Sequence, residues 1–354
     1  MKNFLKTLPR LACCALLGAA LLALPRETAD GVRQGLHLLG SDVLPSLFPF
    51  LVLSSYLSLS GAADGLCRLL RRCTKRLFRM SEGALIAVLM GLIGGYPVGP
   101  KTAADLYRAG RVSRNEAERL IYFTANVSPA FAVSFVGLFT LRNAAAGALL
   151  YAAAVLSALT VGWLCRFLAD GKPPVPAADL PARHAVTGAV ASATQAALSV
   201  AGWVLTFAVG SALLDNAGLP SAAVLFLRSV IEVTTGCRAV AGAVALPVTA
   251  AVVGFGGLAV LCQIAPYAEE CGVPLRRVFA LRGVNAALCA LYAEGLTKLF
   301  PQAVPAAVLL GAPRPALSAG VPAAALLTVT AAIFVLEVDN RRKTCYNTGR
   351  KNRE

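Results

Sequence analysis

The most informative chemical group in this sequence is the carboxylate of Glu232, because it lies inside the otherwise apolar run 221–245. A charged side chain within a membrane segment costs about 2.5–3.5 kcal/mol or more, so such a residue is expected to have a function. We expect Glu232 to bind a coupling proton or cation, or to pair with Arg228 or Arg238. The alternative is a structural ion pair that holds the segment together.

A set of polar residues in and beside the interrupted apolar segments could bind a solute. Lys101 and Arg238 could pair with carboxylates, Tyr96 could stack on an aromatic ring, and the hydroxyl and amide groups could supply polar contacts. For Lys101 the alternative is an anchor at the cytoplasmic membrane surface. Gln263 is a weaker addition to the set. The predicted substrate-binding residues are Tyr96, Lys101, Asn126, Ser128, Thr234, Thr235 and Arg238.

Glycine and proline around these residues predict interruptions of the helical backbone. Non-helical backbone at membrane depth survives only where protein or water satisfies it, so the interruptions should line a cavity. Helices that restart after Pro97, Pro129 and Gly236 would present free N–H groups that favour an anion. The predicted breaks are Gly94, Gly95, Pro97, Gly99, Pro129, Gly236, Gly256 and Gly257.

The composition predicts the elements that must position these groups. The chain is 57% hydrophobic and only 14% charged, whereas soluble domains are about 25% charged. Crossing a hydrocarbon core of about 30 Å takes roughly 20 helical residues. We therefore predict an all-α polytopic membrane protein with about eight transmembrane helices, at 8–24, 43–62, 120–141, 144–168, 187–214, 246–267, 278–299 and 317–338.

The positive charges between these runs predict the topology. Six cations in the loop from Arg68 to Arg79 place that loop, and therefore the N-terminus, on the cytoplasmic side. The segment 101–119 is basic as well, so the run at 83–100 should enter and leave from the same side as a re-entrant hairpin. A second hairpin at 221–245 would enter from the outside. The two halves then form an inverted repeat, and both termini are cytoplasmic.

This topology divides the chain into six parts. The first span is expected to stay uncleaved because many further spans follow it. The predicted parts are an N-terminal anchor span (1–30), a first repeat with its hairpin at 83–100 (31–168), a Pro-rich cytoplasmic linker (169–186), a second, inverted repeat with its hairpin at 221–245 (187–300), a final span (301–340) and a basic cytoplasmic tail (341–354).

Several function classes are disfavoured by the sequence. The net charge of +15 comes largely from loops between apolar runs, which predicts contact with anionic lipids and not with nucleic acid. Ten scattered cysteines without a C-x-x-C pair, and only two histidines, give no support for a metal site or a disulfide framework. No catalytic or cofactor-binding motif is present, so we expect neither an enzyme nor a cofactor.

Two segments resemble a known family. GLIGGYPVGPKTAADLYRAGRVSRNEAERLIYFTANVSPAF is similar to the segment that marks the YlbJ-like sporulation integral membrane proteins, which carry the nucleoside-recognition Gate domain. IEVTTG resembles the matching acidic motif of their second half, and the resemblance covers roughly residues 40 to 300. It implies a distant relation to concentrative nucleoside transporters and a role in endospore formation.

The resemblance further implies a substrate and a location. The implied role is to move dipicolinate, a small organic dianion, from the mother cell across the outer forespore membrane. Two alternatives remain open: a carrier of nucleosides or another small solute, and a membrane scaffold for spore-envelope or cortex assembly that does not transport.

Overall fold

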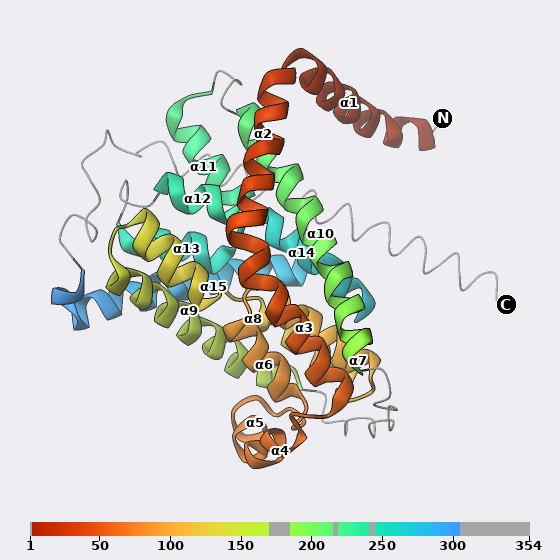
Figure 1. Cartoon of the computed structure of the whole chain (residues 1–354), viewed down its shortest axis with the longest axis vertical. Helices are drawn as coiled ribbons and strands as arrows, with labels where there is room; N and C mark the ends of the chain where they lie inside the picture. Colours follow the sequence, from red (N-terminus) through yellow and green to blue (C-terminus); the bar gives the residue numbers. More distant parts are fainter. Residues whose placement is uncertain (1, 170–184, 215–218, 241–244, 305–354) are drawn as a thin grey trace.

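The computed structural model describes residues 2–169, 185–214, 219–240 and 245–304, and within these ranges the regular elements are all helical, with no sheet (Figure 1). The prediction of an all-helical membrane protein is confirmed in this coarse form. Four helices are long and apolar enough to cross a bilayer, namely Pro25–Ser60, Ala144–Leu168, Ala185–Leu214 and Leu246–Glu270. Shorter apolar helices accompany them at Cys14–Ala23, Ala84–Ile93, Ala130–Thr140 and Ser221–Ile231.

The second helix is much longer than the predicted span 43–62. After α1 (Lys2–Ala23), the helices α2 (Pro25–Leu38) and α3 (Leu44–Ser60) are joined by the π-helical turn η1 (Leu39–Val43) into one helix of 36 residues. Pro25 can begin this helix because the first turn needs no N–H donor. Gly31 and Gly35 let it approach α10 (Ala185–Leu214) closely, since a Cβ at Gly31 would lie 2.8 Å from Cα of Val209.

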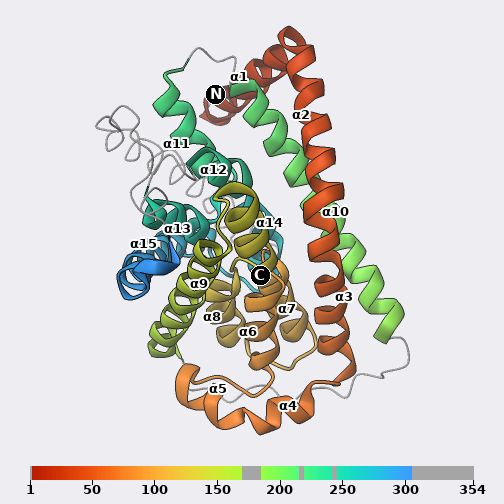
Figure 2. The same cartoon turned by 60° about the vertical axis from the view of Figure 1, so that its left-hand side comes forward.

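The first half continues with two pairs of short helices. The basic helices α4 (Asp64–Leu69) and α5 (Arg71–Phe78) lie at one end of the molecule (Figure 2). They lead to α6 (Ala84–Ile93) and α7 (Val98–Arg108), which pack against each other. The turn between α6 and α7 contains Gly95, with a φ of +81°, and a cis peptide bond before Pro97.

The next helix is interrupted where the sequence predicts it. A capping box starts α8 (Arg114–Thr124), where the Ser113 hydroxyl accepts the Glu116 N–H at 3.2 Å and the Glu116 carboxylate accepts the Ser113 N–H at 2.8 Å. Residues 125–128 are not helical, and from Pro129 the chain turns helical again and enters a π-type helix, η2 (Ala130–Thr140). The helix α9 (Ala144–Cys165) completes this half, with the 3₁₀ turn η3 (Arg166–Leu168) at its end.

Within the described residues, the second half consists of a long helix, four short helices and a final long helix. After the long helix α10 come two short packed helices, α11 (Ser221–Ile231) and α12 (Val233–Val240), and then α13 (Leu246–Phe255) and α14 (Gly257–Glu270). The break between α13 and α14 lies at Gly256, whose φ is +81°. Finally α15 (Leu275–Leu299) packs against α13 and α9 and is followed by the 3₁₀ turn η5 (Pro301–Ala303).

Two predicted breaks lie inside helices instead. Gly99 belongs to the first turn of α7, where a proline at position 100 is also tolerated. A Cβ at Gly99 would stand 2.7 Å from Cα of Gly91, and one at Gly236 would stand 2.7 Å from Cα of Ser229. These glycines therefore allow helices to approach closely and do not interrupt them.

Parts of the predicted organisation lie outside the described residues. This holds for nearly all of the Pro-rich linker 169–186, for the predicted final span 317–338 and for the basic tail 341–354.

A candidate solute-binding cavity

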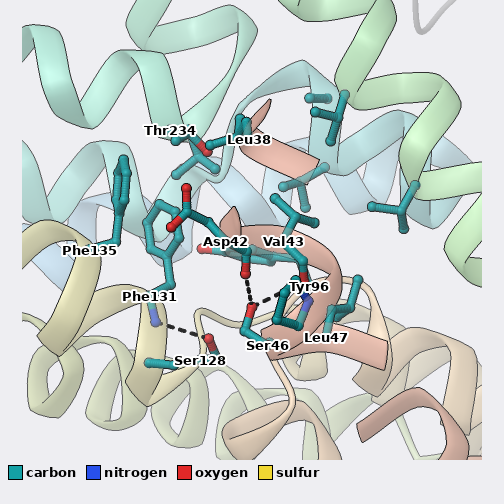
Figure 3. A pocket seen from close by; sticks show the side chains of 18 of the residues that line it. Leu38, Asp42, Val43, Ser46, Leu47, Tyr96, Ser128, Phe131, Phe135 and Thr234 are labelled. Carbon is teal, nitrogen blue, oxygen red and sulfur yellow. Dashed lines mark hydrogen bonds between the residues drawn. The ribbon is translucent and has the colours of Figure 1, made fainter. Parts of the chain in front are cut away.

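A cavity of about 390 Å³ lies where the interrupted segments of the two halves meet the π turn of the long helix (Figure 3). Its wall combines the turn between α6 and α7, the segment 128–139, the start of α12, part of α14, and Val200 and Val204 of α10. Three phenylalanines, Phe131, Phe135 and Phe139, contribute aromatic surface. The lining residues with polar side-chain groups are Ser41, Asp42, Ser46, Tyr96, Ser128, Ser134, Glu232, Thr234 and Gln263.

Five of the predicted side chains line this cavity, and Gly94 and Gly95 do so as well. They are Tyr96 and Ser128 from the first half, and Glu232, Thr234 and the weaker candidate Gln263 from the second. Figure 3 shows Tyr96, Ser128 and Thr234 around the same space. Residues that are far apart in the sequence therefore meet at one site.

The cation Lys101 is not part of the wall. It is only 2% exposed, and its three N–H groups donate to the Ser55 hydroxyl at 2.6 Å, the Ser192 hydroxyl at 2.8 Å and the Asp105 carboxylate at 2.6 Å. An ammonium group has three donors, so all of them are used. Lys101 thus joins α7 to α3 and α10.

Three other predicted residues also lie outside the wall. The exposed side chain of Arg238 lies over the ring of Phe135, 5.1 Å from its centroid. Thr235 supports Glu232 through its backbone N–H. Asn126 is buried, and its amide oxygen accepts the N–H of Val127 at 3.0 Å, whereas its amide nitrogen has no hydrogen-bond partner among the described residues.

Glu232 forms the junction between α11 and α12. Its backbone is extended, with φ −146° and ψ +130°, and its carboxylate accepts the N–H groups of Thr234 at 2.8 Å and Thr235 at 2.7 Å. These are charge-assisted hydrogen bonds at the positive end of a helix, and they stabilise a carboxylate that is only 7% exposed. The side chain therefore caps α12 while it lines the cavity.

The sequence interpretation missed two charged residues, Asp42 and Arg282. Asp42 lies on η1, accepts a hydrogen bond from the Ser41 hydroxyl at 2.8 Å and lines the cavity. Arg282 on α15 is 1% exposed; it donates to the carbonyls of Phe255, at 2.8 Å, and Ala125, and lies over the Tyr96 ring, 5.3 Å from its centroid. The rule that selected Glu232, a charge inside an apolar run, would have selected Arg282 as well.

The charge of the wall differs from the sequence expectation. Among the described lining residues there are two carboxylates, Asp42 and Glu232, and neither lysine nor arginine. Two cations contact lining residues from outside the wall, since Arg238 lies over the ring of Phe135 and Arg282 lies over the ring of Tyr96. The cavity itself therefore suits an aromatic or polar solute that is neutral or accompanied by a cation.

Comparison with known proteins supplies the biological context. No protein-family model matches the chain, and no solved structure matches it. The chain is 28% identical over 321 residues to the sporulation integral membrane protein YlbJ of Bacillus subtilis (strain 168), an alignment that covers 77% of this chain and 79% of that protein. The resemblance to the YlbJ-like sporulation integral membrane proteins is thereby confirmed, and the chain is a homologue of the sporulation integral membrane protein YlbJ.

Proposed function

We propose that this protein is a secondary-type carrier that moves a small solute across a bacterial membrane during endospore formation, and that it is not an enzyme. The observation that carries the proposal is the cavity at which interrupted segments of both halves meet. Transporters with internal repeats bind their substrates at such junctions of broken helices. The cavity volume of about 390 Å³ is in the range of small-molecule sites. The name of the Bacillus relative supports the link to sporulation.

The proposed topology has about eight spans, two re-entrant hairpins and an inverted repeat. Its support is the length of the short helices, because α6 and α7 have 10 and 11 residues and α11 and α12 have 11 and 8. At 1.5 Å per residue each rises about 12–16 Å, roughly half the hydrocarbon thickness. Basic loops then place both termini in the cytoplasm and contact anionic lipids, with no role for nucleic acid.

The proposed substrate is dipicolinate, carried across the outer forespore membrane. The rings of Tyr96, Phe131 and Phe135 could stack on its pyridine ring, and the hydroxyls of the wall could bind its oxygens. Asp42 and Glu232 would repel a bare dianion, so we propose that protons or cations enter with it. Uptake should then depend on the accompanying cation.

A nucleoside is the second candidate, and one observation favours it. Neither lysine nor arginine is found in the described wall, and a neutral nucleoside needs none. A base could stack on the same rings while the ribose bonds to the hydroxyls. Competition between uridine and dipicolinate for the purified protein separates the two substrates.

The test is uptake of labelled dipicolinate and labelled uridine into proteoliposomes. We compare Thr234→Ala, which removes a hydroxyl from the cavity wall, with the control Thr206→Ala, which removes one from an exposed position on α10. One neutral hydrogen bond is worth about 0.5–1.5 kcal/mol, so KM should rise about 2- to 10-fold in Thr234→Ala and stay unchanged in the control. Glu232→Gln should abolish the dependence on the accompanying cation.

The opposite results are equally informative. If folded, inserted protein transports neither solute, the carrier proposal is wrong and the scaffold alternative gains support. The scaffold alternative further predicts that Glu232, Asn126 and Lys101 tolerate substitution in sporulating cells, whereas changes in the loop 171–183 do not.

A further inference from the structure

The guanidinium group of Arg282 is buried and only partly bonded. Its Nε donates to the carbonyl of Phe255 at the end of α13, and its Nη1 donates to the carbonyl of Ala125 at the end of α8. Its Nη2 has no hydrogen-bond partner within the described parts of the chain, and no ion pair is found between Arg282 and a described carboxylate. One buried cation therefore retains donors for another group.

The known contacts of Arg282 do not replace a counter-ion. Helix C-termini carry about half a negative charge, and an aromatic face attracts a cation, so α8, α13 and Tyr96 offset part of the burial cost. The unused N–H groups of Nη2 keep their own desolvation penalty. Asn126, the residue after Ala125, adds a second buried nitrogen without a described partner.

Space and access at Nη2 are determined by Gly256 and Tyr96. A Cβ at Gly256 would lie 2.8 Å from Nη2 and 3.4 Å from Cε1 of Tyr96, so glycine keeps this side of the guanidinium clear. Tyr96 contacts Arg282 and also lines the cavity. The Tyr96 hydroxyl also donates to the carbonyl of Val253, so the ring must give up this bond before it can move away from the guanidinium.

We propose that Nη2 of Arg282 is an anion-binding subsite that receives a carboxylate of an aromatic carboxylate solute when the Tyr96 ring moves aside. The inference rests on the proposed carrier function and names the anion-recognising group that the cavity wall lacks. The competing interpretation is that Arg282 serves only to bond the ends of α8 and α13.

The first test measures ligand-dependent thermal unfolding of the purified full-length protein. Dipicolinate is compared with pyridine-2,6-dicarboxamide, which has the same shape and no charge. We expect only dipicolinate to raise the melting temperature of the wild type. Arg282→Gln should lose this increase, whereas the control Arg277→Gln, which removes a 60% exposed arginine from the same helix, should keep it.

A second variant, Asn126→Asp, keeps Arg282 and is expected to raise the melting temperature of the protein without ligand. Asn126→Asp introduces a carboxylate in the residue that follows Ala125, the carbonyl partner of Nη1. We expect this carboxylate to pair with the guanidinium, so the melting temperature without ligand should rise while the dipicolinate-dependent increase disappears. If Arg282 only bonds helix ends, Asn126→Asp leaves the response to ligand unchanged. The Asn126→Asp variant therefore distinguishes the anion subsite from a purely structural role of Arg282 even if Arg282→Gln does not fold.

Failure of the subsite and failure of the carrier proposal are distinguishable. An equal response of the wild type to both ligands, or a dipicolinate-specific increase that survives in Arg282→Gln, would overturn the subsite even when uptake is present. An Arg282-dependent increase in protein that transports nothing would leave the subsite in place and refute the carrier function.

Discussion

Replacing Lys101 by methionine tests whether this buried cation stabilises the fold or contacts the solute. Methionine keeps the unbranched side chain but loses three hydrogen bonds, to Ser55, Ser192 and Asp105. Breaking a buried ion pair costs about 3–5 kcal/mol because one charge remains uncompensated. Asp105 keeps a second partner, Arg108 at 3.1 Å, so we expect a loss at the lower end, about 3 kcal/mol.

The assay is the free energy of unfolding of the purified protein in mixed micelles titrated with SDS. A loss of about 3 kcal/mol lowers the folding equilibrium constant roughly a hundredfold. The double variant Lys101→Met/Asp105→Asn also removes the carboxylate that has lost its buried partner and should regain most of this loss. The matched control is Lys298→Met, which breaks the i,i+4 pair with Glu294 at 2.7 Å, where the two side chains are 75% and 52% exposed. An exposed helical pair contributes only about 0.3–0.5 kcal/mol.

Two results would refute this reasoning. If Lys101→Met costs no more than Lys298→Met, the buried network does not stabilise the fold. If stability is unchanged but KM for the solute rises, Lys101 contacts the solute in a conformation other than the one described.

Two further predictions concern packing and topology. Gly99→Ala should lower the free energy of unfolding by about 1–3 kcal/mol, because the new Cβ would meet the backbone of Gly91 and Thr124. The control Gly65→Ala has open space around it and should be nearly neutral. Equal effects of the two substitutions would contradict the packing explanation. For the hairpin topology, a cysteine introduced at the exposed position Arg114 should react with an impermeant thiol reagent only after permeabilisation, and one at the exposed position Ala145 should react in intact cells. Labelling of the 114 position from outside would show that 83–100 crosses the membrane.

The part of the site that could be predicted follows from two signals. The cost of a charge in an apolar run selected Glu232, and the predicted helix breaks selected Tyr96, Ser128 and Thr234; all four line the cavity. These signals do not say which residues a polar group will contact. Lys101 lies at a predicted break too, but its partners Ser55 and Ser192 are 46 and 91 residues away along the chain, and only the tertiary structure brings them together.

Other features could not be distinguished by sequence pattern. Glycine in an apolar run fits both a helix break, as at Gly256, and a close helix contact, as at Gly99 and Gly236. Asp42 escaped notice because it lies one residue before the predicted span 43–62, and the π turn that joins it to a longer helix has no sequence signature.

The long helix Pro25–Ser60 has a mechanical consequence for the cavity. It rises about 54 Å, and α10 packs along both of its halves, so the two helices form a strut on one side of the molecule (Figure 2). The strut supplies one wall of the cavity, from Leu38 to Leu47 together with Val200 and Val204, and the interrupted helices supply the others. A rocking motion between strut and body would widen or narrow the cavity directly, without unfolding either part.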